Sequence, residues 1–153
     1  MSKLNIFGKN IKVLLDLFNL FKYDKQEAKE LTVRKVYDAI SNLKNIELLL
    51  ISIDNLENDR IFDLISRENI RLHVSNIRRM ISFLEKYKNS IQSGKYPREV
   101  GPTEDEYLSV IGGSNTLKNI YDVIYPNRAS IYAQLVNDSP QGMISIYKDM
   151  LIS

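Results

Sequence analysis

Apolar residues recur every three or four positions along most of the chain, and the longest uninterrupted stretch covers residues 66–94. Its main apolar positions lie seven residues apart, at Ile70, Ile77, Leu84 and Ile91. This spacing places them on one side of a helix that buries that side against its neighbours. Ser66 is a suitable N-cap residue, and Gly94 is a suitable residue at which to end the helix. The pattern therefore predicts a central helix over residues 67–93, about 40 Å long.

Two further long helices are predicted before the central one. Residues 4–23 carry apolar side chains around most of the helix, because Val13 and Leu17 widen the apolar arc. Such a helix is expected to be buried on two sides; the alternative is a helix that lies in a membrane interface. Residues 32–56 carry another apolar stripe, and the wholly apolar run 48–51 within it indicates deep burial.

The composition changes after residue 93. Residues 1–93 contain one glycine and no proline, whereas residues 94–153 contain five glycines and all four prolines. Shorter helices separated by turns are therefore expected in the second part. Their predicted boundaries are a capping box at Thr103–Glu106, an end at Gly112-Gly113, a helix stopped by Pro126, a helix capped by Asn127, and a last helix over 141–152 begun by Ser139-Pro140.

These elements predict an all-α fold in one domain that covers residues 1–153. The long-helix part, residues 1–93, forms a bundle of three helices, and the short-helix part, residues 103–153, packs against it. A chain of 153 residues is long enough for one core. Residues 95–103 are the best candidate for a linker, but the 50 residues after them are few for an independent core.

The composition narrows the possible chemistry. The chain has no cysteine, which excludes disulfides, cysteine-ligated zinc, iron–sulfur clusters and thiol catalysis. A cysteine-free chain suits a cytoplasmic location. No apolar run reaches the roughly 18 residues needed to cross a bilayer, and the N-terminus lacks the pattern of a signal peptide. We therefore expect no membrane partner and no cofactor or metal.

Positive charge is concentrated on the central helix. Residues 67–95 contain seven Lys/Arg and two Asp/Glu, a net charge of +5, while residues 1–66 are neutral overall and residues 96–153 carry −3. The side opposite the apolar stripe carries the candidate partner-binding residues Arg71, Arg78, Arg79 and Lys86. This basic face is either a solvated helix surface or a docking surface for an acidic protein or for nucleic acid phosphate.

The only histidine, His73, lies at the edge of the apolar stripe, where a packed or hydrogen-bonded structural role is typical. Residues Arg67 to His73 (RENIRLH) are loosely similar to the ribonuclease motif of HEPN domains, in which an arginine and a histidine lie on one helix. This resemblance covers seven residues and implies RNA cleavage by Arg67 and His73 in a dimer cleft. Glu68 departs from the residue that usually follows the arginine.

Two other motifs bear on nucleic-acid and anion binding. Val74-Ser75 and Ile77-Arg78-Arg79 are similar to the start of a recognition helix, but the unbroken heptad leaves no place for the turn of a helix-turn-helix. The segment 112–116 (GGSNT) precedes a predicted helix, where backbone N–H groups bind anions, although a glycine pair between helices is more typical of a plain turn.

Three functions remain. The first is a non-enzymatic interaction or regulatory protein, of inhibitor, immunity or adaptor type, that docks an acidic protein on the basic face. The second is a nucleic-acid-binding protein that uses the same face, and the third is the HEPN-like ribonuclease. The first is favoured because no catalytic constellation is recognisable in the sequence. The oligomeric state is left open, a homodimer included.

Overall fold

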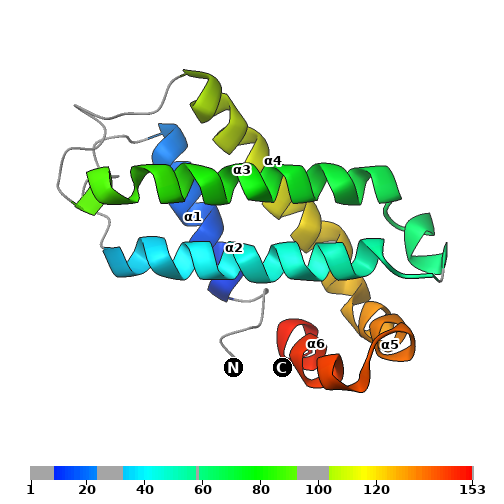
Figure 1. Cartoon of the computed structure of the whole chain (residues 1–153). Helices are drawn as coiled ribbons and strands as arrows, with labels where there is room; N and C mark the ends of the chain where they lie inside the picture. The colour runs from blue at the N-terminus through cyan, green and yellow to red at the C-terminus, as the bar shows by residue number, and fades with distance from the viewer. Residues whose placement is uncertain (1–8, 24–32, 58, 93–103, 153) are drawn as a thin grey trace.

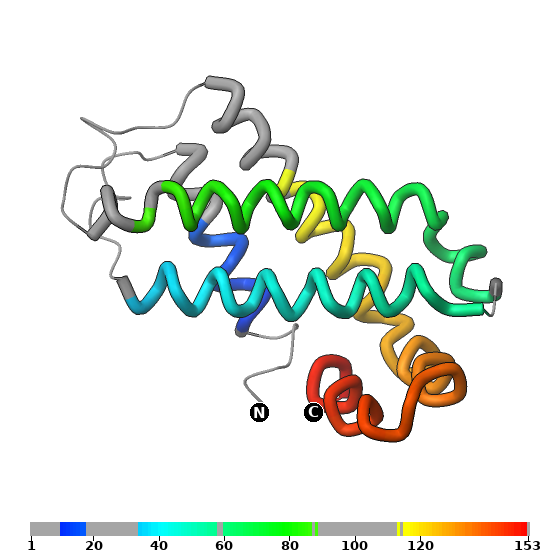
Figure 2. Tube along the Cα trace, viewed as in Figure 1, coloured from blue at the N-terminus to red at the C-terminus, as the bar shows by residue number. Residues whose placement is uncertain are grey.

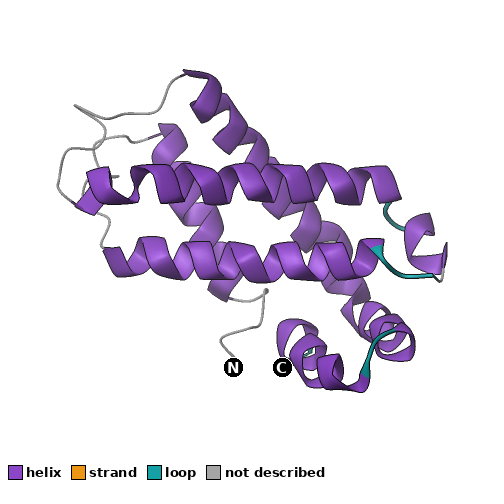
Figure 3. Ribbon diagram, viewed as in Figure 1, coloured by secondary structure: helices purple, strands orange, loops and turns teal. Residues whose placement is uncertain are grey.

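A computed structural model describes residues 9–23, 33–57, 59–92 and 104–152, and every regular element in these residues is a helix (Figure 3). The α-helices are α1 (Lys9–Tyr23), α2 (Val33–Asp54), α3 (Arg67–Gln92), α4 (Glu104–Ile124), α5 (Arg128–Asp138) and α6 (Ile144–Leu151). Short 3-10 helices are η2 (Asp59–Asp63), η3 (Tyr125–Asn127) and η4 (Gln141–Met143). The prediction of an all-α bundle with shorter helices at its C-terminal end is confirmed.

The helices form two crossed layers. α2 and α3 lie side by side and antiparallel in one layer, and α1 and α4 cross behind them (Figure 1). The chain then continues from the end of α4 into α5 and α6, which pack against each other and reach the C-terminal half of α2 (Figure 2). Because α3 contacts both α2 and α4 extensively, the predicted central role of this helix is confirmed.

The apolar stripe of α3 forms the middle of the core. Ile70, Ile77 and Leu84 are fully buried, as the seven-residue spacing predicts. The Oγ of Ser66 accepts a hydrogen bond from the backbone N–H of Asn69 at 3.1 Å, which is the predicted N-cap. The predicted stop at Gly94, the linker at 95–103 and the Thr103 capping box lie outside the described residues.

Arg67 joins the end of α2 to the start of α3. Its guanidinium donates hydrogen bonds to the carbonyl oxygens of Asp54, at 2.8 Å, and Leu56, at 3.3 Å. The same group lies 4.1 Å from the centre of the Phe62 ring, over the 3-10 helix between the two α-helices. The carbonyl of Asp54 is in the last turn of α2 and that of Leu56 lies two residues beyond it, so neither has an intrahelical donor. Arg67 therefore supplies donors at the C-terminus of α2 and sets where α3 begins beside it.

The predicted break at Gly112-Gly113 is wrong, because α4 runs through both glycines. Gly113 is buried where α4 crosses α3. An ideally placed Cβ at this position would lie 2.5 Å from Cγ and 3.0 Å from Cε of Met80, and would also meet its Sδ. The glycine therefore serves the close approach of two helices instead of a turn, and the proposed anion site at the start of a helix is absent from this segment.

The N-terminal helices pack largely as expected. In α1, Ile11, Leu14 and Leu17 are buried, which confirms burial of its main apolar side. Val13, however, is 49% exposed, so the predicted burial of the wider arc is wrong at this position. In α2, the apolar run is buried at Leu49 and Leu50, the positions that face the core, and exposed at Leu48. Helical periodicity divides this run between core and surface.

Two predicted caps in the C-terminal part behave differently from expectation. The Nδ2 of Asn127 donates to the carbonyl oxygen of Val123 at 2.7 Å, so this amide caps the end of α4 and not the start of α5. Ser139-Pro140 was expected to begin the last α-helix at residue 141. The residues after Pro140 instead form the 3-10 helix η4 (Gln141–Met143), and the α-helix begins at Ile144. The Tyr147 hydroxyl donates to Oγ of Ser52 at 3.0 Å, which attaches α6 to α2.

We predict that Gly113→Ala destabilises the fold by about 1–3 kcal/mol, because the added methyl overfills the contact with Met80. This loss exceeds the gain of about 1 kcal/mol that alanine brings to a helix. Gly142→Ala is the matched control, since no atom lies within 4 Å of the place that its Cβ would take. Chemical denaturation measures both, and equal or increased stability of Gly113→Ala would contradict the close approach.

We also predict that Arg67→Ala lowers the free energy of unfolding by about 1.5–3 kcal/mol, because two charge-assisted hydrogen bonds to carbonyls are lost. Arg79→Ala on the same helix should change it by less than about 0.5 kcal/mol, as expected for an exposed side chain. Urea titrations of the two variants beside the unchanged chain test this. Similar small effects for both variants would show that Arg67 does not stabilise the junction between the end of α2 and the start of α3.

Candidate binding groove between α2 and α3

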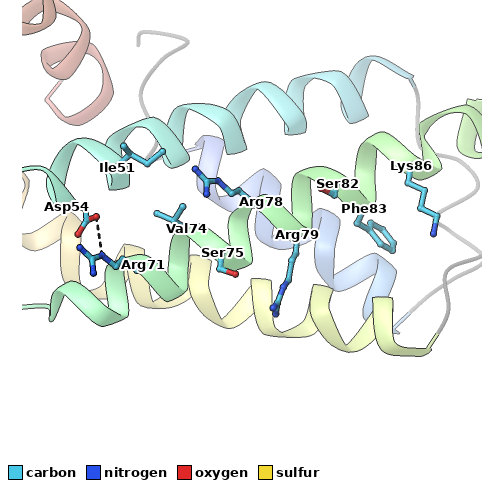
Figure 4. A pocket seen from close by; sticks show the side chains of 10 residues that line it. All are labelled: Ile51, Asp54, Arg71, Val74, Ser75, Arg78, Arg79, Ser82, Phe83 and Lys86. Atoms are coloured by element: carbon cyan, nitrogen blue, oxygen red, sulfur yellow. Dashed lines mark hydrogen bonds and ion pairs between the residues drawn. The ribbon is translucent and has the colours of Figure 1, made fainter.

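A hollow of about 710 Å³ lies on the α2–α3 layer (Figure 4). Its apolar lining residues are Ile51 from α2 and Val74 and Phe83 from α3. Val74 lies on the side of α3 that faces α2, and Phe83, nine positions later, lies on the opposite side (Figure 4). The polar side chains around it are Asp54, Arg71, Ser75, Arg78, Arg79, Ser82 and Lys86. We call these ten residues the α2–α3 groove. The structure thus brings all four predicted partner-binding residues, Arg71, Arg78, Arg79 and Lys86, to one concave surface.

The groove follows from helical spacing on α3. Its polar residues on α3 recur at intervals of three, four and seven positions, which places them in adjoining rows on the exposed side of the helix. The rows diverge at the arginine pair: Arg78 extends toward α2, whereas Arg79 extends from the other side of α3 (Figure 4). The two arginines therefore lie on opposite sides of α3, with Arg78 on the side that faces α2.

Carboxylates of α2 already contact two of these arginines. Arg71 Nε lies 3.3 Å from Oδ2 of Asp54, and Arg78 Nε lies 3.7 Å from Oε1 of Glu47. The arginine side chains remain 64% and 61% exposed. Pairs this exposed contribute at most about 1 kcal/mol each. The contacts reduce the net charge of the predicted basic face without removing its arginines from solvent.

Arg79 differs from its neighbours. It is exposed, and it makes no ion pair or hydrogen bond with any part of the chain that the structure describes. Lys86 is exposed as well but has an interaction within the molecule. Arg79 is therefore the cation of the groove that is available to a partner without loss of a contact to the described residues.

Sequence reasoning did not identify the residues that α2 contributes. Glu47 and Asp54 lie seven residues apart, and so do Arg71 and Arg78. In an antiparallel helix pair, equal spacing allows both ion pairs to form at once. This match was a usable signal, but it becomes meaningful only when α2 and α3 are known to be neighbours with this register.

A second cluster of polar groups lies between α3 and α4. Nδ1 of His73 is 3.1 Å from Oγ1 of Thr116, and Nε2 is 3.2 Å from Oδ1 of Asn119. Nδ2 of Asn76 donates to the same Thr116 Oγ1 at 2.8 Å. Because an amide oxygen only accepts, His73 donates from Nε2 and accepts at Nδ1 from the threonine hydroxyl. The histidine is thus held as a neutral ring that joins two helices.

Burial sets the protonation behaviour of this ring. His73 is only 8% exposed, and loss of hydration lowers the pKa of its imidazole below 6.5, while the hydrogen bond with Asn119 is a smaller effect in the other direction. The prediction that His73 is a packed, hydrogen-bonded residue is confirmed. Thr116, three residues after the glycine pair that sequence reasoning assigned to a turn, supplies its central partner.

Arg67 and His73 do not share a site within one copy of the chain. Residues six positions apart on a helix point about 120° away from each other. The guanidinium of Arg67 contacts the end of α2, whereas the ring of His73 contacts α4. No contact between described residues supports the HEPN-like ribonuclease, which stays a prediction. The continuous α3 also leaves no turn for a helix-turn-helix.

Two further properties concern the described part of the chain. No three His, Cys, Asp or Glu side chains within it gather where they would hold a metal ion. None of its helices combines the length and apolarity that a bilayer span requires.

Comparison of the chain with models of protein families, with curated proteins and with solved structures finds no match. Only the geometry of the chain itself therefore bears on its function.

We predict that acid destabilises the fold through His73. In the unfolded chain the imidazole has its ordinary pKa of about 6.5, while burial lowers the pKa in the folded chain. As the pH falls below about 6.5, the unfolded state takes up the proton first, so stability decreases until the folded-state pKa is passed. Above that window both states are neutral and the contribution is constant.

Urea titrations between about pH 7.5 and pH 5 test this prediction, with His73→Gln as the comparison, because glutamine keeps donor and acceptor groups but does not titrate. The unchanged chain should lose more stability toward the acid end than the variant, with a slope difference of at most about 1.4 kcal/mol per pH unit. Parallel pH profiles for the two proteins would contradict a lowered pKa.

Proposed function

We propose that this chain is a non-enzymatic interaction or regulatory protein that binds an acidic protein partner through the α2–α3 groove. The observation that carries the proposal is the position of Arg79, an exposed cation with no pairing to the described residues, in the lining of the same hollow as Arg71, Arg78 and Lys86. A cation that serves the fold is normally paired or dispersed over a convex surface. Here several cations surround a hollow, where a ligand can contact them together.

The composition of the groove favours a protein over a nucleic acid. Val74 and Phe83 are almost fully buried and Ile51 is partly buried, so the carbon surface that the hollow offers to apolar side chains comes mainly from Ile51. Asp54 and Glu47 lie on the same face and repel a continuous row of phosphates. A protein segment can place acidic side chains beside the arginines and keep them away from Asp54 and Glu47, whereas the charges of a phosphate backbone are evenly spaced.

The groove is suited to recognition. Its lining consists of arginine, lysine, serine and apolar side chains, and its only carboxylate among the lining residues, Asp54, is paired with Arg71. Inhibitor, immunity and adaptor proteins all act by covering or joining a partner surface, and a rigid pair of helices with preformed side-chain positions supports that use. We place the interaction in the cytoplasm, the compartment that a cysteine-free chain suits.

The full chain, immobilised and exposed to a lysate of its native host at low salt, should retain an acidic protein. Retention should fall about tenfold or more for the double variant Arg78→Glu plus Arg79→Glu, because two attractive contacts become repulsive. Quantitative mass spectrometry of the retained proteins measures the change.

The matched control is Lys12→Glu plus Lys118→Glu, which makes the same change of charge at two exposed positions on α1 and α4. It should retain the partner at the level of the unchanged chain. If both double variants retained equally less of the partner, the effect would come from net charge alone. Binding of the partner in the groove would then be rejected. Retention of nucleic acid that disappears after nuclease treatment, with no specific protein, would favour the nucleic-acid alternative.

A further inference from the structure

The polar side chains of the groove repeat along α3. Each repeat is a row that consists of a cation, a serine four positions later and a second cation four positions after the serine. The first row is Arg71, Ser75 and Arg79, and the second row is Arg78, Ser82 and Lys86. Residues four positions apart form a diagonal ridge on a helix surface. Two parallel rows therefore cross the exposed side of α3, about 10.5 Å apart along its axis.

The carboxylates of α2 follow the same repeat. Asp54 contacts Arg71, the cation that begins the first row, at 3.3 Å, and Glu47 contacts Arg78, the cation that begins the second, at 3.7 Å. Asp54 and Glu47 are themselves seven positions apart. The last cation of each row extends away from α2 (Figure 4). The packed pair of helices thus presents the same series of groups twice, with the first cation of each series placed by a carboxylate.

Each row carries groups that bind a negatively charged oxygen. A serine hydroxyl, a guanidinium and an ammonium can all donate hydrogen bonds, and the serine lies between the two cations of its row. Together with its α2 carboxylate, each row has a net charge of +1. One carboxylate of a ligand balances this charge, whereas a phosphate monoester brings a charge of about −2 and leaves an excess beside Asp54 or Glu47.

We infer that the two rows are a pair of carboxylate subsites, and that the acidic partner binds by two carboxylates about 10 Å apart. This inference rests on the proposed function and specifies what the partner presents to the same site. Once one carboxylate is bound, the second meets its row at a high effective concentration. A segment of equal charge but different spacing reaches only one row at a time.

The last cations make the two subsites unequal. Helical side chains lean toward the N-terminus of their helix, which directs Arg79 toward Ser75, one turn before it. Arg79 has no ion pair or hydrogen bond with the described residues, whereas Lys86 has an interaction within the molecule. The subsite at Ser75 is therefore the stronger of the two.

A neighbouring charge acts in the same direction. Ser75 is followed three positions later by the cation Arg78, and Ser82 is followed at the same interval by Glu85. The carboxylate of Glu85 lies 3.4 Å from Nζ of Lys44 on α2, so it is drawn toward α2 and partly neutralised. It still lowers the positive potential beside Ser82. Loss of the last cation of the first row should consequently cost more affinity than loss of the last cation of the second.

The test uses polyproline peptides as rulers, because the polyproline II helix has three residues per turn and rises about 3.1 Å per residue. Two glutamates three positions apart leave the same side of this helix about 9 Å apart. With nine positions between them they leave the same side about 28 Å apart, at the same total charge. A peptide with one of the glutamates replaced by glutamine is the single-contact reference. Titration of the full isotope-labelled chain at low salt, followed by NMR of the arginine Nε–H signals, gives each Kd.

The closely spaced peptide should bind about fivefold or more tightly than the widely spaced one. The widely spaced peptide should lie within about twofold of the single-contact reference, because only one of its carboxylates binds at a time.

Exchange of single cations assigns the effect to the two rows. Arg79→Ala and Lys86→Ala should each remove the advantage of the closely spaced peptide, with the larger loss of affinity in Arg79→Ala. Lys118→Ala is the matched control, since it removes an exposed cation on α4, and the advantage should persist in it. Loss of the advantage in all three variants would contradict the assignment to the rows.

The other outcomes separate this inference from the proposed function. Equal affinities for the two spacings, or no binding of either peptide, overturn the paired subsites. Tighter binding of a peptide with phosphoserines in place of both glutamates overturns the assignment to carboxylates. If capture of an acidic host protein still depends on Arg78 and Arg79 in these cases, the proposed function stands without the paired subsites. If capture is also independent of these arginines, both are rejected.

Discussion

The antiparallel register of α2 and α3 is the constraint on which the other features depend. Arg67 holds the start of α3 against the carbonyls of Asp54, the last residue of α2, and Leu56, just after it, and the buried Ile70, Ile77 and Leu84 belong to the same core cluster as the buried residues of α2. With that register, Glu47 faces Arg78 and Asp54 faces Arg71. A shift of one helical turn, about 5.4 Å, would separate both pairs and would move Ile51 and Asp54 away from the α3 residues with which they line the groove.

The crossing of α3 and α4 adds a second constraint of a different kind. Gly113 lets the helix axes approach where Met80 fills the interface, and the same approach brings Thr116 within hydrogen-bonding distance of His73. Apolar contact supplies the attraction, and the polar cluster restricts how α4 can rotate, because a buried polar group that loses its partner is costly. The histidine thus belongs to the frame that supports α3, on a different side of the helix from the groove.

This division gives α3 two separate tasks. Its apolar stripe and His73 attach it to α2 and α4, while its remaining face stays exposed and carries the cations. Because the attachment is extensive, the exposed side chains are presented by a rigid element, which reduces the entropy lost when a partner binds. The α2 carboxylates lower the charge of this face, so that the proposed recognition depends on a few positioned residues, Arg79 foremost, more than on overall basicity.

Local spacing in the chain was sufficient for the helices α1, α2 and α3, for the buried stripe of α3 and for its Ser66 cap, because helical periodicity and capping depend on residues within a few positions of one another. The basic face could also be predicted, since all its cations lie on one helix. The path of α4 through Gly112-Gly113, the role of Thr116 and the pairing of Glu47 and Asp54 with arginines could not. Each depends on which residue of a distant helix lies opposite, and that is decided only when the helices pack.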